Sequence, residues 1–340
     1  MTTEVTPPTI DISAFYGNDN AANQILIEQV RLACKTFGFF QIVNHNVPNS
    51  LQEDILKESE DFFNLPVEIK ERYDKDIGGR HLGYERLRAQ NFEKKTEGDL
   101  KEGYYFGTDL PLDHPYVVAG KLNFGPNKYP EEVSSPKQFK STVKLYFAHL
   151  EGLAHDILRI LAATLYLDEN LFDDLNDTPI ATLRLLHYPP QPPTASPDER
   201  VKQKRTHPNS EQPPGIGAHT DFGGITILLQ DMIGGLQVMN QATDQWVDVQ
   251  PRKGALVVNL GNLFMRWTND TYMSNLHRVI NKTGKERYSV PFFFSGNPDY
   301  LVKCLPSCEG AEGAKYLPIS VEEWIAGRYA DTYGSTDVLT

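Results

Sequence analysis

Two side chains that can bind a metal lie two residues apart in the segment GIGAHTDFGGITILLQD, residues 215–231. They are His219 and Asp221, and the run that contains them reads as a β-strand. Alternate side chains of a strand project to the same face, so an imidazole nitrogen and a carboxylate oxygen would meet one ion. Glycines on both sides would let the backbone turn sharply around such a site. We therefore interpret the segment as part of a metal site.

A third ligand is offered by His277, in SNLHRVI, which is another short strand signal. Two histidines and one carboxylate form the facial triad that holds non-haem Fe(II) and leaves positions open for substrate and dioxygen. A bare His-x-Asp pair is common by chance, and a single histidine is more often structural than a ligand. The iron hypothesis therefore needs a second, independent feature.

That feature is RYSVPFFF, in which Arg287 and Ser289 alternate along a strand and project to one side. A guanidinium binds a carboxylate through two parallel hydrogen bonds, and the serine hydroxyl adds a third donor. An arginine inside an apolar strand is costly without an anionic partner. A bound acid explains it, and 2-oxoglutarate can chelate iron with its keto-acid end while its far carboxylate reaches Arg287. The alternative is a salt bridge from Arg287 to a core carboxylate.

The predicted secondary structure that must position these residues changes at Pro179, from mainly helical to mainly β. After Pro179, seven or eight short apolar or alternating runs are punctuated by Gly, Asn and Pro, which is typical of a sandwich or jelly roll. Before it, helical periodicity dominates, with one strand signal at 9–15 and a helix that leads into a strand at Gly38. We expect a mainly β protein with flanking helices.

The expected regions are 7–120, a helix-rich amino-terminal part; 121–178, a long helical segment; 179–300, the β core; and 301–340, a closing helix and tail. The segment 191–214 is polar and proline-rich and is expected to be a surface loop, either a lid or a tolerated insertion.

Composition excludes several classes of function. A chain of 340 residues with 40% hydrophobic content can bury a large core, and a net charge of −12 argues against nucleic acid as a partner. No run of 18 apolar residues and no signal peptide are evident, so neither membrane insertion nor secretion is expected, and we expect a cytoplasmic protein. The three cysteines are too few for a disulfide framework.

Taken together, His219-x-Asp221, His277 and Arg287-x-Ser289 resemble the iron(II) and 2-oxoglutarate dependent dioxygenases of the isopenicillin N synthase-like superfamily. The resemblance extends to FGFFQIVNHNVP, LKEGYYFGTDLP and NLGNLFMRWTND, and covers residues 7 to 330. It implies a double-stranded β-helix, which is a jelly roll, with iron bound by the two histidines and the aspartate, and Arg287 and Ser289 on the cosubstrate carboxylate. Tyr188, in HYPP, matches a tyrosine that often supports the cosubstrate. Leu186 departs from the commoner plant pattern, which has asparagine there.

The resemblance implies an Fe(II)/2-oxoglutarate-dependent dioxygenase that uses O2 to hydroxylate or desaturate a C–H bond of a small molecule, with succinate and CO2 as coproducts. The expected substrate is an amino acid or a specialised metabolite. One alternative is an oxidase that works without 2-oxoglutarate, in which Arg287 and Ser289 would bind the substrate's own carboxylate. Another is a catalytically silent sensor of a small acid. Succinate formation distinguishes the dioxygenase from the oxidase. Failure to consume oxygen with iron and 2-oxoglutarate would favour the sensor.

Residues for substrate selection carry weaker signals. Arg86 and Arg88 lie in RHLGYERLRAQ, next to a segment that approaches the substrate in such enzymes, and Arg184 interrupts the apolar strand ATLRLLHY. Each is a candidate for binding an acidic substrate, although surface arginines are the commoner case. Phe292 is a candidate for an apolar wall, and core packing explains it equally well. No motif specifies the natural substrate, the type of product or the oligomeric state.

Overall fold

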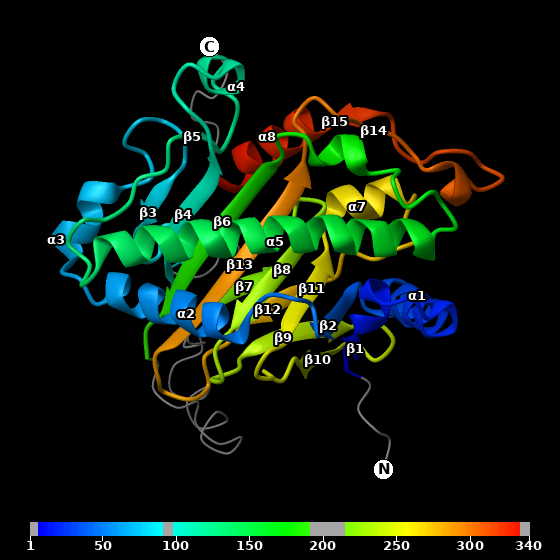
Figure 1. Cartoon of the computed structure of the whole chain (residues 1–340), viewed down its shortest axis with the longest axis horizontal. Coiled ribbons are helices and arrows are strands. Elements are labelled where there is room, and N and C mark those ends of the chain that lie inside the picture. Colours follow the sequence, from blue (N-terminus) through cyan, green and yellow to red (C-terminus); the bar gives the residue numbers. More distant parts are fainter. Residues whose placement is uncertain (1–5, 91–97, 191–214, 334–340) are drawn as a thin grey trace, which may run out of the picture.

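Two β-sheets face each other, and helices cover the outer face of the larger one (Figure 1). The computed structural model describes residues 6–90, 98–190 and 215–333. In the described chain the large sheet has the order β1-β2-β11-β8-β13-β6-β4-β3, with β5 beside β4, and the small sheet has the order β10-β9-β12-β7. The strands of the large sheet are β1 (Thr9–Asp11), β2 (Phe39–Val43), β3 (Gly83–Glu85), β4 (Glu102–Asp109), β5 (Phe124–Gly125), β6 (Ile180–Tyr188), β8 (Ile225–Gln230), β11 (Leu256–Leu260) and β13 (Arg287–Gly296). Those of the small sheet are β7 (Ile216–His219), β9 (Leu236–Asn240), β10 (Gln245–Asp248) and β12 (His277–Val279), and a separate pair is formed by β14 (Leu301–Val302) and β15 (Ile319–Ser320).

The helices begin and end at residues whose chemistry favours those boundaries. Asp19 caps α1 by accepting hydrogen bonds from the backbone N–H groups of Ala21 and Ala22, and Gly38, at φ +63°, turns the chain out of the helix into β2. Proline occupies the first position of the long helix α5. The described helices are α1 (Asn20–Thr36), α2 (Asn49–Phe63), α3 (Val67–Lys70), α4 (Pro115–Val118), α5 (Pro136–Thr164), α7 (Asn262–Trp267) and α8 (Val321–Tyr333).

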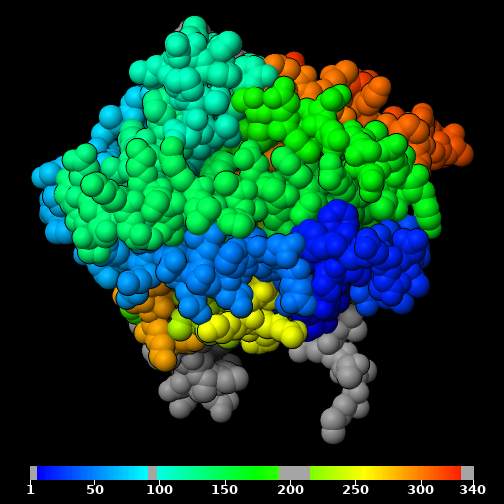
Figure 2. Space-filling view, in the orientation of Figure 1, coloured from blue at the N-terminus to red at the C-terminus, as the bar shows by residue number. Residues whose placement is uncertain are grey.

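The helices bury the outer face of the large sheet. Helix α5 runs across β6, β13 and β8, and α2 lies beside it, so that their side chains hide most of the sheet from this side (Figures 1 and 2). Leu158 of α5, Leu185 of β6 and Phe292 of β13 belong to the main hydrophobic core. A second, smaller core lies between the two sheets and includes Tyr188, Val238 and Val279. The chemistry predicted from the sequence belongs to the side of the sheet that α5 leaves uncovered.

The predicted fold class is confirmed: a jelly-roll core carries a helix-rich amino-terminal region. Within 179–300 the described residues form the eight strands β6 to β13. Strands β1 to β5 join the same large sheet, so the amino-terminal region shares the core with the jelly roll. The four regional boundaries stay a prediction, and the loop at 191–214 lies outside the described residues. Among the described helices, none has the length and apolar character to cross a membrane.

Candidate active site

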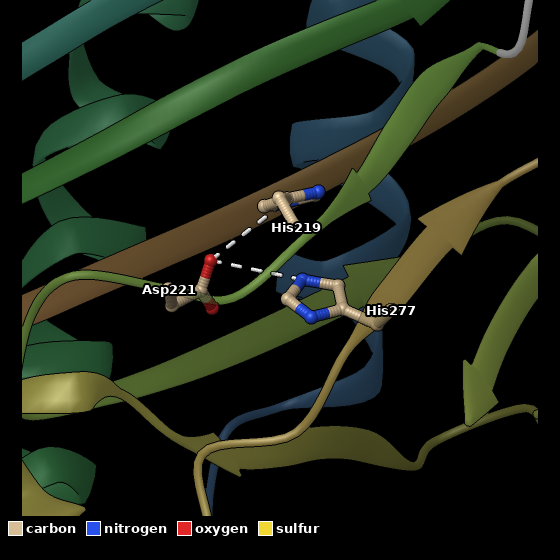
Figure 3. A group of neighbouring side chains, drawn as sticks. All are labelled: His219, Asp221 and His277. Atoms are coloured by element: carbon tan, nitrogen blue, oxygen red, sulfur yellow. Dashed lines mark ion pairs between the residues drawn. The ribbon is translucent and has the colours of Figure 1, made fainter. Parts of the chain in front are cut away.

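His219, Asp221 and His277 converge in one place (Figure 3). Strands β7 and β12 pair so that His219 and His277 are direct cross-strand partners, and the centroids of their rings are 4.2 Å apart. The Oδ1 atom of Asp221 lies 3.8 Å from Nε2 of His219 and 3.7 Å from Nε2 of His277. One potential ligand atom from each residue lies within 4.8 Å of the others, an arrangement that can hold one metal ion.

The position of Asp221 corrects one step of the sequence argument. The alternation of His219 and Asp221 along one strand is wrong, because β7 ends at His219 and Asp221 lies in the connection to β8. That connection is tied down by its backbone: the carbonyl of Asp221 accepts a hydrogen bond from Asn262 N at 2.7 Å. The turn, rather than the pleat of a strand, brings the carboxylate to the histidines.

Hydrogen bonds orient each of the three side chains. Nδ1 of His219 lies 2.8 Å from the carbonyl of Gly217, and Nδ1 of His277 lies 3.2 Å from that of Asn275. A ring that donates from Nδ1 to a carbonyl presents Nε2 as a lone pair, which is the form that binds a metal.

The carboxylate of Asp221 is oriented in the same way. Its Oδ2 accepts hydrogen bonds from Thr226 Oγ1 at 2.6 Å and Asn259 Nδ2 at 2.7 Å. These two donors come from β8 and β11 and are direct cross-strand partners. With Oδ2 engaged twice, Oδ1 is the oxygen that faces the histidines.

The surroundings of His219 and Asp221 favour the protonation states in which these two side chains bind a metal. Burial, reinforced by the neighbouring His277, lowers the pKa of His219 to about 3, although Asp221 opposes the shift. Burial alone would raise the pKa of Asp221, but the two histidines and the donors Thr226 and Asn259 outweigh it and lower that pKa. A neutral imidazole and an ionised carboxylate are the ligand forms that a divalent metal requires.

Arg287, Ser289 and Tyr188 lie together on the inner face of the large sheet. Arg287 and Tyr188 are cross-strand partners on β13 and β6, and the guanidinium lies over the tyrosine ring, 4.5 Å from its centroid. Ser289 Oγ lies 3.4 Å from the hydroxyl of Tyr188. Gly215 packs on this ring, where an added Cβ would come within 2.8 Å of Tyr188 Cδ1. The three polar groups form one cluster, as the alternation along RYSVPFFF predicts.

Arg287 is the buried cation of this cluster. It is 0% exposed, its Nε donates to the carbonyl of Gly234 at 2.6 Å, and its Nη2 lies 3.5 Å from Gln230 Oε1. Its Nη1 is also buried and has no hydrogen-bond partner among the described residues. An unpaired donor on a buried guanidinium suits a ligand that brings a carboxylate. The donor set therefore fits the carboxylate of a small ligand.

A cavity opens beside His219 and Asp221 and is lined by residues from both halves of the chain. Of the four substrate candidates, Arg184 lines it. Arg86 lies outside, with a 59% exposed side chain paired to Glu71 at 3.3 Å and Asp74 at 3.2 Å. Arg88 is exposed and is not among the lining residues. The described residues that line the cavity are Gln90, Lys101, Asn123, Ile180, Thr182, Arg184, Leu186, Ile216, His219, Thr220, Asp221, Phe222, Gly223, Phe293, Ser295, Ile325 and Tyr329.

The structure places Phe292 in the core and Phe293 in the cavity wall. Phe292 is 0% exposed and packs edge-on against Phe147 of α5, with ring centroids 5.1 Å apart. Arg287 and Ser289 face the inner side of β13, so alternation puts Phe293 on that side and Phe292 on the other. The prediction that Phe292 forms an apolar wall of the cavity is therefore wrong. The same alternation that puts Arg287 and Ser289 on one face puts Phe292 on the opposite face.

Sequence reasoning missed several polar residues of the site. Thr226 and Asn259 hold Asp221, and each is a polar residue inside an apolar strand, which is a usable signal. Asn123 lies in the turn before β5 and Tyr329 in the terminal helix α8, and neither carries such a signal. Their place in the cavity depends on how β5 and α8 pack.

Two family models match the chain. The model described as the non-haem dioxygenase in morphine synthesis N-terminal domain matches residues 7–132, and that of the 2OG-Fe(II) oxygenase superfamily matches residues 180–296. The second match contains the metal-ligand candidates and the Arg287 cluster.

Curated relatives and solved structures agree with these models. The 2-oxoglutarate-Fe(II) type oxidoreductase hxnY of Emericella nidulans is 49% identical over 97% of this chain and 91% of its own length. Clavatol oxidase claD of Penicillium crustosum is 38% identical over 96% of each chain. A full-length Neurospora crassa protein, solved with alpha-KG and 5-formyluracil, superposes with a TM-score of 0.81 at 28% identity over 98% of each chain. The chain therefore belongs to the 2OG-Fe(II) oxygenase superfamily and is a non-haem iron enzyme that uses Fe(II), 2-oxoglutarate and O2.

Proposed function

We propose that His219, Asp221 and His277 bind Fe(II), and that Arg287, Ser289 and Tyr188 bind the far carboxylate of 2-oxoglutarate. The observation that carries the cosubstrate assignment is the buried Nη1 of Arg287, to which no described residue offers an acceptor. A cosubstrate carboxylate would receive that donor together with the hydroxyls of Ser289 and Tyr188, which lie 3.4 Å from each other. The aspartate and histidine atoms that face one another supply the iron ligands.

The proposed reaction is oxidation of a small-molecule C–H bond, by hydroxylation or desaturation, with succinate and CO2 as coproducts. The iron centre, when bound, supplies the oxidising chemistry by coupling it to decarboxylation of 2-oxoglutarate. The protein's own groups orient the participants: Thr226 and Asn259 hold Asp221, and the cavity wall holds the substrate near His219 and Asp221. We also propose a cytoplasmic location, as the sequence suggests.

We infer the chemical class of the substrate from the cavity wall. The guanidinium of Arg184 lies 4.3 Å from the ring centroid of Tyr105 and 4.8 Å from that of Phe293. A planar substrate could stack on this arrangement of aromatic rings and guanidinium. Arg184 also supplies N–H donors that suit a carbonyl or carboxylate oxygen. A ring with an acceptor group therefore suits this side of the cavity.

Asn123 favours a substrate that also carries a hydrogen-bond donor. Its side-chain amide donates to Thr182 Oγ1 and to the hydroxyl of Tyr329, each at 3.2 Å, while its buried Oδ1 receives no hydrogen bond from the part of the chain that the structure describes. A substrate N–H or O–H group would satisfy this acceptor. We therefore propose a small ring metabolite that carries both an acceptor and a donor. The Neurospora crassa protein has also been solved with thymine, a compound of that description, which supports the class.

The proposal is tested in two stages. In the first, purified apoprotein is titrated anaerobically with Fe(II) and then 2-oxoglutarate, and the weak visible charge-transfer band of a chelated keto acid is recorded. We expect the band to appear with one equivalent of 2-oxoglutarate. Iron binding without a band would reject 2-oxoglutarate as ligand and favour an oxidase.

In the second stage, oxygen uptake and succinate release are measured with a panel of small molecules. The panel contains ring compounds with and without donor and acceptor groups, including thymine and 5-formyluracil, and a set of amino acids. We expect faster succinate release with ring compounds that carry both groups. Stimulation by amino acids alone would overturn the proposed substrate class.

A further inference from the structure

The strand that carries the first metal-ligand candidate is paired irregularly with its neighbour. Strand β7 lies at the edge of the small sheet and pairs with β12 among the described strands. The register of that pairing shifts between His277 and Val279. Contacts from outside the sheet therefore contribute to fixing the position of this short strand.

Asp99 provides such a contact from the other half of the chain. Its Oδ1 accepts a hydrogen bond from the backbone N–H of Gly217, the second residue of β7, at 2.9 Å. The carbonyl of Gly217 in turn lies 2.8 Å from Nδ1 of His219. Asp99 is 0% exposed, so this interaction is shielded from water. Two consecutive hydrogen bonds thus lead from a buried carboxylate to the ring of His219.

Asp99 is itself held in place by its neighbours in the chain. Its backbone N–H donates to the carbonyl of Gln90 at 2.8 Å, and its own carbonyl accepts from Lys101 N at 2.8 Å. Gln90 and Lys101 both line the cavity. The segment around Asp99 therefore joins the cavity wall to the strand of His219.

We propose that Asp99 is a positioning residue that sets the orientation of His219 by holding the backbone of Gly217. The proposal rests on the metal-ligand role proposed above for His219. Without the acceptor, the buried N–H of Gly217 would lose its partner, which costs stability locally and lets the edge strand shift. Groups that orient a metal ligand through hydrogen bonds typically change metal affinity by roughly 10- to 100-fold when they are removed.

The test measures Co(II) binding to the apoprotein by competition with a fluorescent chelator, together with the visible absorption spectrum of bound Co(II). Asp99→Asn keeps an oxygen acceptor at the same reach, so we expect a dissociation constant within about threefold of wild type and an unchanged spectrum. Asp99→Ala removes the acceptor, and we expect roughly 10- to 100-fold weaker binding and an altered spectrum. If Asp99→Ala does not fold, Asp99→Thr replaces it, since its hydroxyl stops short of the carboxylate position.

A matched control separates positioning from the loss of any buried charge. Glu102 is a buried carboxylate on β4 whose partners are Lys70, Tyr84 and His187. Glu102→Gln should leave the Co(II) constant and spectrum unchanged.

Two outcomes would overturn the proposal. One is an Asp99→Ala or Asp99→Thr variant that binds Co(II) like wild type; the other is an Asp99→Asn variant that loses affinity as much as they do, which would assign the effect to charge. A wild-type protein that binds no Co(II) would instead reject the metal role of His219 itself.

Discussion

The proposed iron and cosubstrate side of the site and the wall of the adjoining cavity are built in different ways. On the proposed iron and cosubstrate side, paired strands place residues directly opposite one another: His219 faces His277, and Arg287 faces Tyr188. The proposed substrate wall contains Gln90, Asn123, Arg184, Phe293 and Tyr329. These residues come from the loop after β3, the turn before β5, strands β6 and β13, and helix α8.

The difference teaches that the groups proposed for the reaction and those proposed for substrate selection are held by different kinds of structure. In the large sheet a core on each face specifies the strand register, so Arg287 and Tyr188 are held firmly, whereas His219 lies on an edge strand and needs further support. A wall assembled from separate segments can change one residue at a time without disturbing that register.

The largest expected effect lies on the iron side. Asp221→Ala removes the only carboxylate among the three ligand candidates, and we expect turnover to fall by at least about 100-fold with the fold retained. Oxygen uptake with 2-oxoglutarate and saturating Fe(II), metal content and circular dichroism measure the result. The exposed Glu169→Ala is the control, and retained turnover at full iron occupancy would reject the triad.

Two adjacent phenylalanines of β13, Phe292 in the core and Phe293 in the cavity wall, allow the effects of the two positions to be compared directly. Phe292→Ala empties a core position, and we expect a loss of about 3–5 kcal/mol in the free energy of unfolding. Phe293→Ala should cost less stability but weaken substrate binding, because that ring lies in the cavity wall. Urea unfolding and substrate KM distinguish the two. Equal losses of stability with unchanged KM would contradict the assignment.

On the cosubstrate side, Arg287→Ala removes the buried cation that we propose binds the far carboxylate of 2-oxoglutarate. We expect 2-oxoglutarate to bind more weakly by roughly 2–5 kcal/mol, measured by titration of the charge-transfer band. Arg287→Lys should recover only part of the loss, since lysine cannot form two parallel bonds. Arg159→Ala, at a partly exposed arginine of α5, is the control. Unchanged affinity in Arg287→Ala would reject its role.

The smallest expected effect lies in the substrate wall. The hydroxyl of Tyr329 lies 3.3 Å from Arg184 Nη2 and 3.2 Å from Asn123 Nδ2. Tyr329→Phe should raise substrate KM by about 2- to 10-fold, because each bond contributes about 0.5–1.5 kcal/mol, and should leave 2-oxoglutarate affinity unchanged.

The matched control for this variant is Tyr316→Phe, whose hydroxyl bonds Asp270 at 2.8 Å on the surface. The substrate is the compound from the panel that gives the fastest succinate release. A fall in kcat or in 2-oxoglutarate affinity with unchanged KM would place Tyr329 on the iron side instead.

Alternation along a strand was the most productive sequence signal. It predicted that Arg287 and Ser289 share a face, and the same rule applied further along the strand finds Phe293 and Ser295 in the cavity wall. The rule failed for Asp221 because the strand had already ended at His219. A short edge strand and the turn after it cannot be separated by pattern alone, since both are rich in glycine and polar residues.

The amino-acid sequence by itself determined the donor set of this protein: which histidines, carboxylate, arginine and serine are present, and on which short runs they alternate. Such spacing is local, and the pleat of a strand converts it into a shared face. Only the tertiary structure decided which arginine enters the cavity, because Arg86, Arg88 and Arg184 all stand in plausible sequence contexts. It also brought Asn123 of the β5 region and Tyr329 of α8 to one hydrogen-bonded cluster, since contacts between distant segments depend on sheet order and helix packing.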